Sequence, residues 1–173
     1  TLGNAAPLNA VDTCLDMGAG ITMAQGFNVI EPDKKAIAFV GDSTFFASGM
    51  TGVANAVYNK HDITIVVLDN ATTAMTGSQP HPGTGATLMG GFSAPISIQE
   101  VLSALGVKKI TKANPLFADK AIEAAREAID YDGPSAVIYE SPCTKLTKAK
   151  PPVYFIANAC AGCRKCVTTI GCP

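Results

Sequence analysis

The chain has 173 residues, of which 47% are hydrophobic and 16% charged, and its net charge is −1. This nearly balanced charge gives no electrostatic footprint for nucleic acid or an anionic membrane, so neither is expected as a partner. No apolar run approaches the roughly 18 residues of a membrane span, and no signal-peptide pattern opens the chain. We therefore expect one hydrophobic core in a cytoplasmic protein.

The first residue is Thr rather than Met, which predicts a fragment of a longer polypeptide. Residues 1–8 contain Gly and Pro without periodicity and predict an entry loop. From Asp12 to Gly26 the sequence is rich in small and apolar residues and predicts a helix that packs closely on its neighbours, with Pro32 as a break before the first strand.

Two apolar runs with a helical pattern between them predict a βαβ unit. The runs are KAIAFV at 35–40 and ITIVVL at 63–68, and the segment 49–60 between them carries apolar residues at i, i+3, i+4 and i+7. The strands of such a unit are parallel and the crossover is right-handed. Their carboxyl ends should therefore lie side by side.

Polar residues follow both strands at that edge, where open α/β sheets bind ligands. Gly41-Asp42-Ser43 ends the first run and Asp69-Asn70 ends the second. A carboxylate, an amide oxygen and carbonyls of the following loop suit Mg²⁺, which usually keeps substrate phosphates in its shell. Free N–H groups at the start of the 49–60 helix could receive an anion. The alternative is an ordinary pair of strand-end turns, in which the same residue types are common.

The rest of the chain predicts further alternation of helices and strands. Residues 71–97 form a long loop without periodicity, and loops of this length tend to be functional or disordered. Its polar groups at Thr72, Thr73, Thr76, Gln79 and His81 are the candidates to face a ligand. Helices are predicted at 98–105 and 116–131 and strands at 107–111 and 135–141, which indicates an α/β, doubly wound parallel sheet. We expect this domain over 1–146, and a linker with a short ferredoxin-like cysteine segment over 147–173.

Several strings in the chain resemble a known family. GDSTFF, NAVYN, LDN, TTAMTG and QPHPGTG are similar to the large (alpha, IorA) subunit of the indolepyruvate ferredoxin oxidoreductase family, and the GDS and LDN pair to its thiamin diphosphate motif. The resemblance covers most of the chain. It departs at Ala47 and Ser78, where the family pattern often has His, and these losses bear on substrate choice or activity.

The resemblance implies thiamin diphosphate as cofactor, with Mg²⁺ held by the side chains of Asp42 and Asn70 and the carbonyl of Thr72. It implies no assignable catalytic residue, because a Glu from a separate domain activates the cofactor in this class. We therefore expect the 173-residue chain alone not to turn over. The cofactor-binding residues that the resemblance implies are Gly41, Asp42, Ser43, Asn70, Thr72, Thr73, Met75 and Thr76.

Four of the six cysteines lie within the last 14 residues. Cys160, Cys163 and Cys166 have the C-x2-C-x2-C spacing of a ferredoxin-like [4Fe–4S] site, and Cys172-Pro173 follows after a gap of five residues. Cys172 could ligate this cluster, another cluster or nothing, and a Cys₄ zinc site is the alternative. The isolated Cys14 and Cys143 are expected to be buried small hydrophobes.

A thiamin diphosphate site and an Fe–S cluster on one chain imply oxidative decarboxylation of a 2-oxo acid to an acyl-CoA and CO₂. The resemblance further implies an aryl 2-oxo acid such as indolepyruvate, coenzyme A, ferredoxin as electron acceptor, and a smaller beta (IorB-like) partner subunit. A non-oxidative thiamin diphosphate-dependent decarboxylase and a non-catalytic metal-binding interaction module are the alternatives. The decarboxylase would need no cysteine run, and the interaction module would need no cofactor.

Overall fold

The computed structural model describes residues 2–147 and 158–169. Contacts divide the chain into two units, Asp16–Thr147 and the terminal segments Thr1–Leu15 with Lys148–Pro173. The predicted boundary between residues 146 and 147 stays a prediction. In the parts of the chain that the structure describes, none of the helices has the length and hydropathy to cross a membrane.

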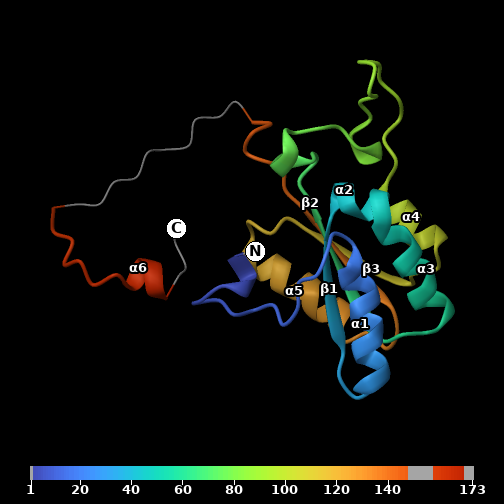
Figure 1. The fold of residues 1–173 in the computed structure, drawn as a ribbon, viewed down its shortest axis with the longest axis horizontal. Helices are drawn as coiled ribbons and strands as arrows, with labels where there is room; N and C mark the ends of the chain where they lie inside the picture. Colours follow the sequence, from blue (N-terminus) through green and yellow to red (C-terminus); the bar gives the residue numbers. More distant parts are fainter. Residues whose placement is uncertain (1, 148–157, 170–173) are drawn as a thin grey trace. The chain divides into compact units, whose positions relative to one another are not determined.

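The larger unit is built on one parallel sheet of four strands (Figure 1). Its strands are β1 (Ala36–Gly41), β2 (Ile63–Asp69), β3 (Lys109–Ala113) and β4 (Ser135–Glu140), and their order is β1-β2-β4-β3. Every pairing is parallel. The predicted parallel α/β sheet is therefore confirmed, and the apolar runs that predicted β1 and β2 match these strands to within one residue.

Helices cover both faces of this sheet, which makes it doubly wound. On one face lie α1 (Ala19–Ile30), α3 (Met50–Tyr58) and α4 (Ile98–Ala104), and on the other lies α5 (Ala118–Ile129). Burial of each large apolar side chain contributes about 1.5–3 kcal/mol. The first face is the larger core, and its fully buried side chains include Ile21, Phe45, Val53, Ile65, Val67, Leu102 and Ile138.

The helical segment after β1 starts earlier than the apolar pattern predicted. The short helix α2 (Asp42–Thr44) follows Gly41 directly and runs through a π-helical turn at Phe45–Gly49 into α3. The Met50 N–H donates to the Phe45 carbonyl, so the chain is already helical at residue 49. The predicted anion site there is wrong, because the first turn of the helical segment lies at Asp42.

The first long helix, α1, begins later than the sequence predicted. It begins at Ala19 rather than Asp12, after Gly18 at a φ of 98°, and it continues through Gly26 to Ile30. A Cβ at Gly18 would stand 2.2 Å from the Ser48 Oγ. The close approach and the positive φ together explain why the helix starts after a glycine.

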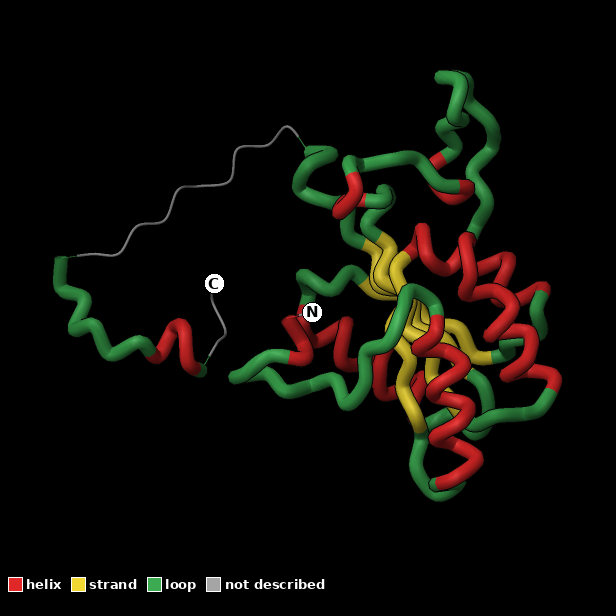
Figure 2. The backbone as a smooth tube through the Cα atoms, viewed as in Figure 1, coloured by secondary structure: helices red, strands yellow, loops and turns green. Residues whose placement is uncertain are grey.

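The connection from β2 to α4 is mainly loop (Figure 2). It contains two single 3₁₀ turns, Ala74–Thr76 and Pro82–Thr84, and two isolated antiparallel bridges, Thr73 with Gln79 and Ala86 with Phe92. These bridges fold the long loop back on itself twice. The first fold lies directly after the end of β2.

In the other unit the structure describes a 3₁₀ turn at Leu2–Asn4 and the single-turn helix α6 at Lys165–Thr168. Cys14 is exposed, so its prediction as a buried small hydrophobe is wrong. Cys143, in the larger unit, is half-buried.

Candidate functional site

The register of the first two strands brings the candidate ligands together. Gly41 pairs with Leu68 across β1 and β2, so Asp42 and the Asp69-Asn70 pair leave the sheet at the same level. The Asn70 backbone N–H donates to Asp42 Oδ2 at 3.1 Å. The ends of β1 and β2 therefore lie side by side as predicted, and this hydrogen bond joins them.

The Asp42 carboxyl group is held by two backbone N–H donors and a contact with the ring of His81. Its side chain is only 4% exposed. Oδ1 accepts from the Ser43 N–H at 2.8 Å, and Oδ2 accepts from the Asn70 N–H and contacts the ring of His81 at 3.1 Å. The sheet edge thus presents an oriented, nearly solvent-free carboxylate.

The oxygens beside it suit a hard cation. Asn70 Oδ1 accepts the Thr72 N–H at 3.1 Å, which turns the chain sharply after β2. Each carboxylate or amide oxygen has two acceptor positions, so Asp42 Oδ1 and Asn70 Oδ1 each keep one that these hydrogen bonds do not use. Together with a backbone carbonyl of the turn, this donor set fits Mg²⁺.

Two hydroxyl groups connect the helix start to the loop. Thr73 Oγ1 donates to Ser43 Oγ at 2.8 Å, and the Thr73 N–H donates to the Gln79 carbonyl at 3.0 Å. A Cβ at Gly41 would meet no atom within 4 Å, so the backbone there is open to close approach by a ligand.

Two other candidates do not reach this group of contacts. Met75 is 95% exposed, and Thr76 is exposed and bonds Gln79 within its own turn. The departures from the family pattern lie at the exposed Ala47 in the π-helical turn and at Ser78, whose φ is 62°. Their roles stay predictions.

The contact between His81 and Asp42 was missed by the sequence analysis, which named His81 only as a polar loop residue. His81 caps the turn Pro82–Thr84. Its ring accepts from the Gly83 N–H, and the His81 backbone N–H donates to Thr84 Oγ1. A cap residue followed by Pro at the first helical position is a recognisable signal for such a turn. Its approach to a residue 39 positions earlier has no such signal.

Asp69 lies beside this group. Burial raises the pKa of its carboxyl group, the Ala71 N–H opposes this, and the nearby Asp42 adds to the increase. Asp69 also lines a hollow of about 220 Å³ with Lys112 and Glu140, which form an ion pair at 2.7 Å. This hollow lies on the same carboxyl edge of the sheet.

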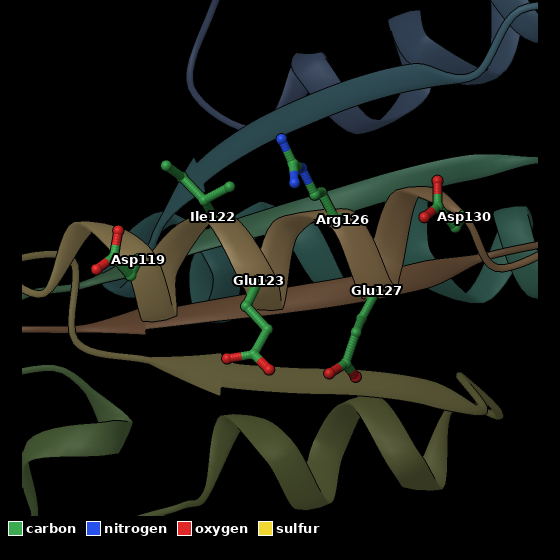
Figure 3. Close-up of a pocket in the computed structure, with 6 residues that line it drawn as sticks. All are labelled: Asp119, Ile122, Glu123, Arg126, Glu127 and Asp130. Carbon is green, nitrogen blue, oxygen red and sulfur yellow. The ribbon is translucent and has the colours of Figure 1, made fainter.

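A second hollow, of about 560 Å³, lies on the surface of α5 (Figure 3). Its lining residues lie on this one helix and at Asp130 directly after it. Glu123 and Glu127 point to one side of the helix, while Ile122 and Arg126 point to the other. No strand end contributes to it, so it is a helix surface rather than a site.

The cysteine segment has a different character. Cys160, Cys163 and Cys166 are all exposed free thiols. Within the described residues, no three His, Cys, Asp or Glu side chains gather in an arrangement that could hold a metal ion. Cys172 lies outside the described residues, and the [4Fe–4S] assignment stays a prediction.

Known proteins share the sequence and the fold of this chain. Residues 3–139 match the family described as "Thiamine pyrophosphate enzyme, C-terminal TPP binding domain". The chain is 37% identical to the indolepyruvate oxidoreductase subunit IorA of Archaeoglobus fulgidus, over 100% of this chain and 29% of that protein. It is also 37% identical to IorA of Methanothermobacter thermautotrophicus, over 100% of this chain and 28% of that protein.

A solved structure shares the fold. The 2-oxoglutarate:ferredoxin oxidoreductase of Magnetococcus marinus superposes with a TM-score of 0.66 at 22% identity, covering 76% of this chain and 47% of that one. The chain spans less than a third of the length of the IorA relatives it matches. The resemblance found in the sequence is confirmed, and the chain belongs to the thiamine pyrophosphate enzymes, as a C-terminal TPP-binding domain of the IorA type.

Proposed function

We propose that this chain binds the diphosphate end of thiamin diphosphate in a 2-oxo acid:ferredoxin oxidoreductase. One observation carries the proposal. The Asn70 N–H bonds the buried Asp42 carboxylate at the joined ends of β1 and β2, in a chain whose family binds this cofactor. A buried carboxylate of this kind is costly unless it serves a charged partner.

Mg²⁺ would be held by Asp42, Asn70 and the Thr72 carbonyl, with the diphosphate completing its shell. Gly41, Ser43 and Thr73 would line the diphosphate, because they surround the same strand ends. Met75 and Thr76 would reach the cofactor from the loop. When bound, thiamin diphosphate supplies the carbanion chemistry by which a 2-oxo acid loses CO₂, and the protein binds and orients it.

We assign the cysteine segment to electron transfer. Cys160, Cys163 and Cys166, with Cys172 as a candidate, would hold a [4Fe–4S] cluster. In the overall reaction a 2-oxo acid and coenzyme A give an acyl-CoA and CO₂, and two electrons leave one at a time through clusters to ferredoxin. The names of the IorA relatives support indolepyruvate as substrate, and we propose a smaller beta-type partner subunit and a cytoplasmic location.

Two measurements on the purified chain test this proposal. Calorimetric titration with thiamin diphosphate should show binding with Mg²⁺ and none after Mg²⁺ is removed. Anaerobic purification followed by metal analysis and EPR should find iron with the spectrum of a reduced [4Fe–4S] cluster. Cofactor binding without iron would favour a non-oxidative decarboxylase, and metal binding without cofactor affinity would favour an interaction module.

A further inference from the structure

The ring of His81 is buried between the loop and the start of the helical segment. Its side chain is 4% exposed, and Nε2 lies 3.1 Å from Asp42 Oδ2. The Gly83 N–H points at Nδ1 at 3.2 Å. The ring stacks on Phe46 with centroids 5.8 Å apart and an interplanar angle of 29°. Both nitrogens and one face of the imidazole are therefore engaged.

These contacts assign the proton of the ring. Nδ1 accepts a hydrogen bond from a backbone N–H, so it carries no proton, and the proton of a neutral imidazole must then lie on Nε2. The Nε2–H group donates to Asp42 Oδ2. His81 thus acts toward Asp42 as a hydrogen-bond donor.

The two oxygens of Asp42 consequently differ. Oδ2 accepts from both the Asn70 N–H and the His81 Nε2–H, which fills its two acceptor positions. Oδ1 accepts from the Ser43 N–H and so keeps one acceptor position, and the carboxyl group of Asp69 lies close to that of Asp42. A cation can therefore be bound through Oδ1 alone. Binding by one carboxylate oxygen suits the octahedral shell of Mg²⁺, whereas Ca²⁺ often takes both.

We propose that His81 is a positioning residue for the cation site. It holds the Asp42 carboxylate in one orientation with Oδ1 free, and it fastens the loop that follows Asn70 to the helix start through Asp42 and Phe46. This inference rests on the proposed function insofar as the cation is the Mg²⁺ of thiamin diphosphate. The orientation of the carboxylate does not depend on which cation binds.

Two variants of His81 and one control distinguish the effect of the His81 N–H donor from the effect of its ring packing on Phe46. His81→Phe keeps an aromatic ring against Phe46 and removes the N–H group, while His81→Gln places an amide N–H near the position of Nε2. His61→Phe changes the other histidine of the chain. It lies just before the first residue of β2, at the end of the strand away from the site. Circular dichroism melting of each variant checks that it is folded.

Calorimetry with Mg²⁺ and thiamin diphosphate should show affinity about 10- to 100-fold weaker for His81→Phe, since hydrogen bonds to charged groups are stronger than those between neutral groups. His81→Gln should recover most of this loss, and His61→Phe should match the parent chain. Equal affinities of His81→Phe and the parent, or losses as large in His81→Gln as in His81→Phe, would overturn the positioning role.

A second readout needs no ligand. Long-range ¹H–¹⁵N NMR of the cofactor-free chain distinguishes the two imidazole tautomers, and we expect His81 to be protonated on Nε2 alone. A parent chain that does not bind thiamin diphosphate would contradict the proposed function. The positioning role is then decided by this spectrum, in which a proton on Nδ1 overturns it and a proton on Nε2 supports it.

Discussion

The strand-end site and the cysteine segment present their candidate ligands in opposite ways. At the strand ends Asp42 is 3% exposed, and its carboxyl group accepts from the Ser43 and Asn70 N–H groups and contacts His81. In the segment 160–166 the three thiols are exposed and not gathered. The first site is organised by the fold before any ligand binds. The second has donors of suitable chemistry and spacing, and under the proposed assignment a metal would have to assemble them.

This difference has an energetic meaning. A pre-formed site loses little conformational entropy on binding, whereas a segment that orders around its ligand spends part of the binding free energy on that ordering. We therefore expect the two sites to respond independently to substitution. The first three predictions below each change one site and measure both, and the fourth changes neither site.

The largest effect should come from Asp42→Ala. The substitution removes the charged ligand and leaves the Asn70 N–H and the His81 ring without their acceptor. Each buried donor left without a partner costs about 1–3 kcal/mol. Thiamin diphosphate binding in calorimetry should weaken at least ~100-fold, while the iron content stays unchanged. The exposed Asp33→Ala is the matched control. Unchanged affinity in Asp42→Ala would remove Asp42 from the site.

Cys163→Ser should have the second largest effect, confined to the other unit. Loss of one thiolate from the C-x2-C-x2-C run should reduce bound iron to a minor fraction of the parent value, as measured by metal analysis and EPR after anaerobic purification. Affinity for thiamin diphosphate should not change. The exposed Cys14→Ser serves as control. Stoichiometric zinc without iron in the parent chain would contradict the assignment to Fe–S.

A smaller effect is expected from Thr73→Val. This nearly isosteric change removes the hydroxyl bond to Ser43 at 2.8 Å, which is worth about 1 kcal/mol. Affinity for Mg²⁺ and thiamin diphosphate should fall by roughly fivefold, with iron content unchanged. Thr51→Val, on the exposed side of α3, is the control. A loss as large as that of Asp42→Ala would mean that Thr73 contacts the metal itself.

Tyr139→Phe should leave both sites unchanged and lower the free energy of unfolding by about 1 kcal/mol, because the Tyr139 hydroxyl donates to the Ala121 carbonyl at 2.7 Å. Burial raises the pKa of Tyr139 above 10.0 in the folded chain. The native state then holds this proton more tightly than the unfolded state, so the contribution is complete below about pH 10 and is lost as the pH rises through the raised pKa. The difference in the free energy of unfolding between the parent chain and Tyr139→Phe should therefore become smaller as the pH rises through this pKa.

Denaturant unfolding at several alkaline pH values measures this difference, and the difference absorbance of the two chains near 295 nm reports the titration of Tyr139 itself. A deficit that widens above pH 10 would contradict the sign of the pKa shift.

The sheet could be predicted from sequence because buried parallel strands are continuous apolar runs. The lengths of β1 and β2 follow from KAIAFV and ITIVVL, and their side-by-side ends follow from the handedness of one crossover. The helix start at Asp42 could not be predicted. Phe45 and Phe46 are adjacent rather than helically spaced, and the π-helical turn shifts the periodicity that becomes visible only from Met50.

The same limit applies to the site. Asp42 and Asn70 are joined by regular structure, so the rules of sheet topology placed them together. His81 reaches Asp42 through an irregular loop whose path is set by single contacts, such as the bridge of Thr73 with Gln79 and the cap at Gly83. Irregular loops have no repeating pattern, and their tertiary contacts are not visible in one sequence.

The strand order has a consequence for synthesis of the chain. The strand β4 is the last in sequence, yet it lies between β2 and β3 and pairs with both. A nascent chain that has emerged only as far as residue 134 can pair β1 with β2 but has nothing to hold β3 beside them. The sheet is complete only when residues 135–140 leave the ribosome, so two of its three strand pairs wait for the last strand. Until then apolar strand edges are open to other chains.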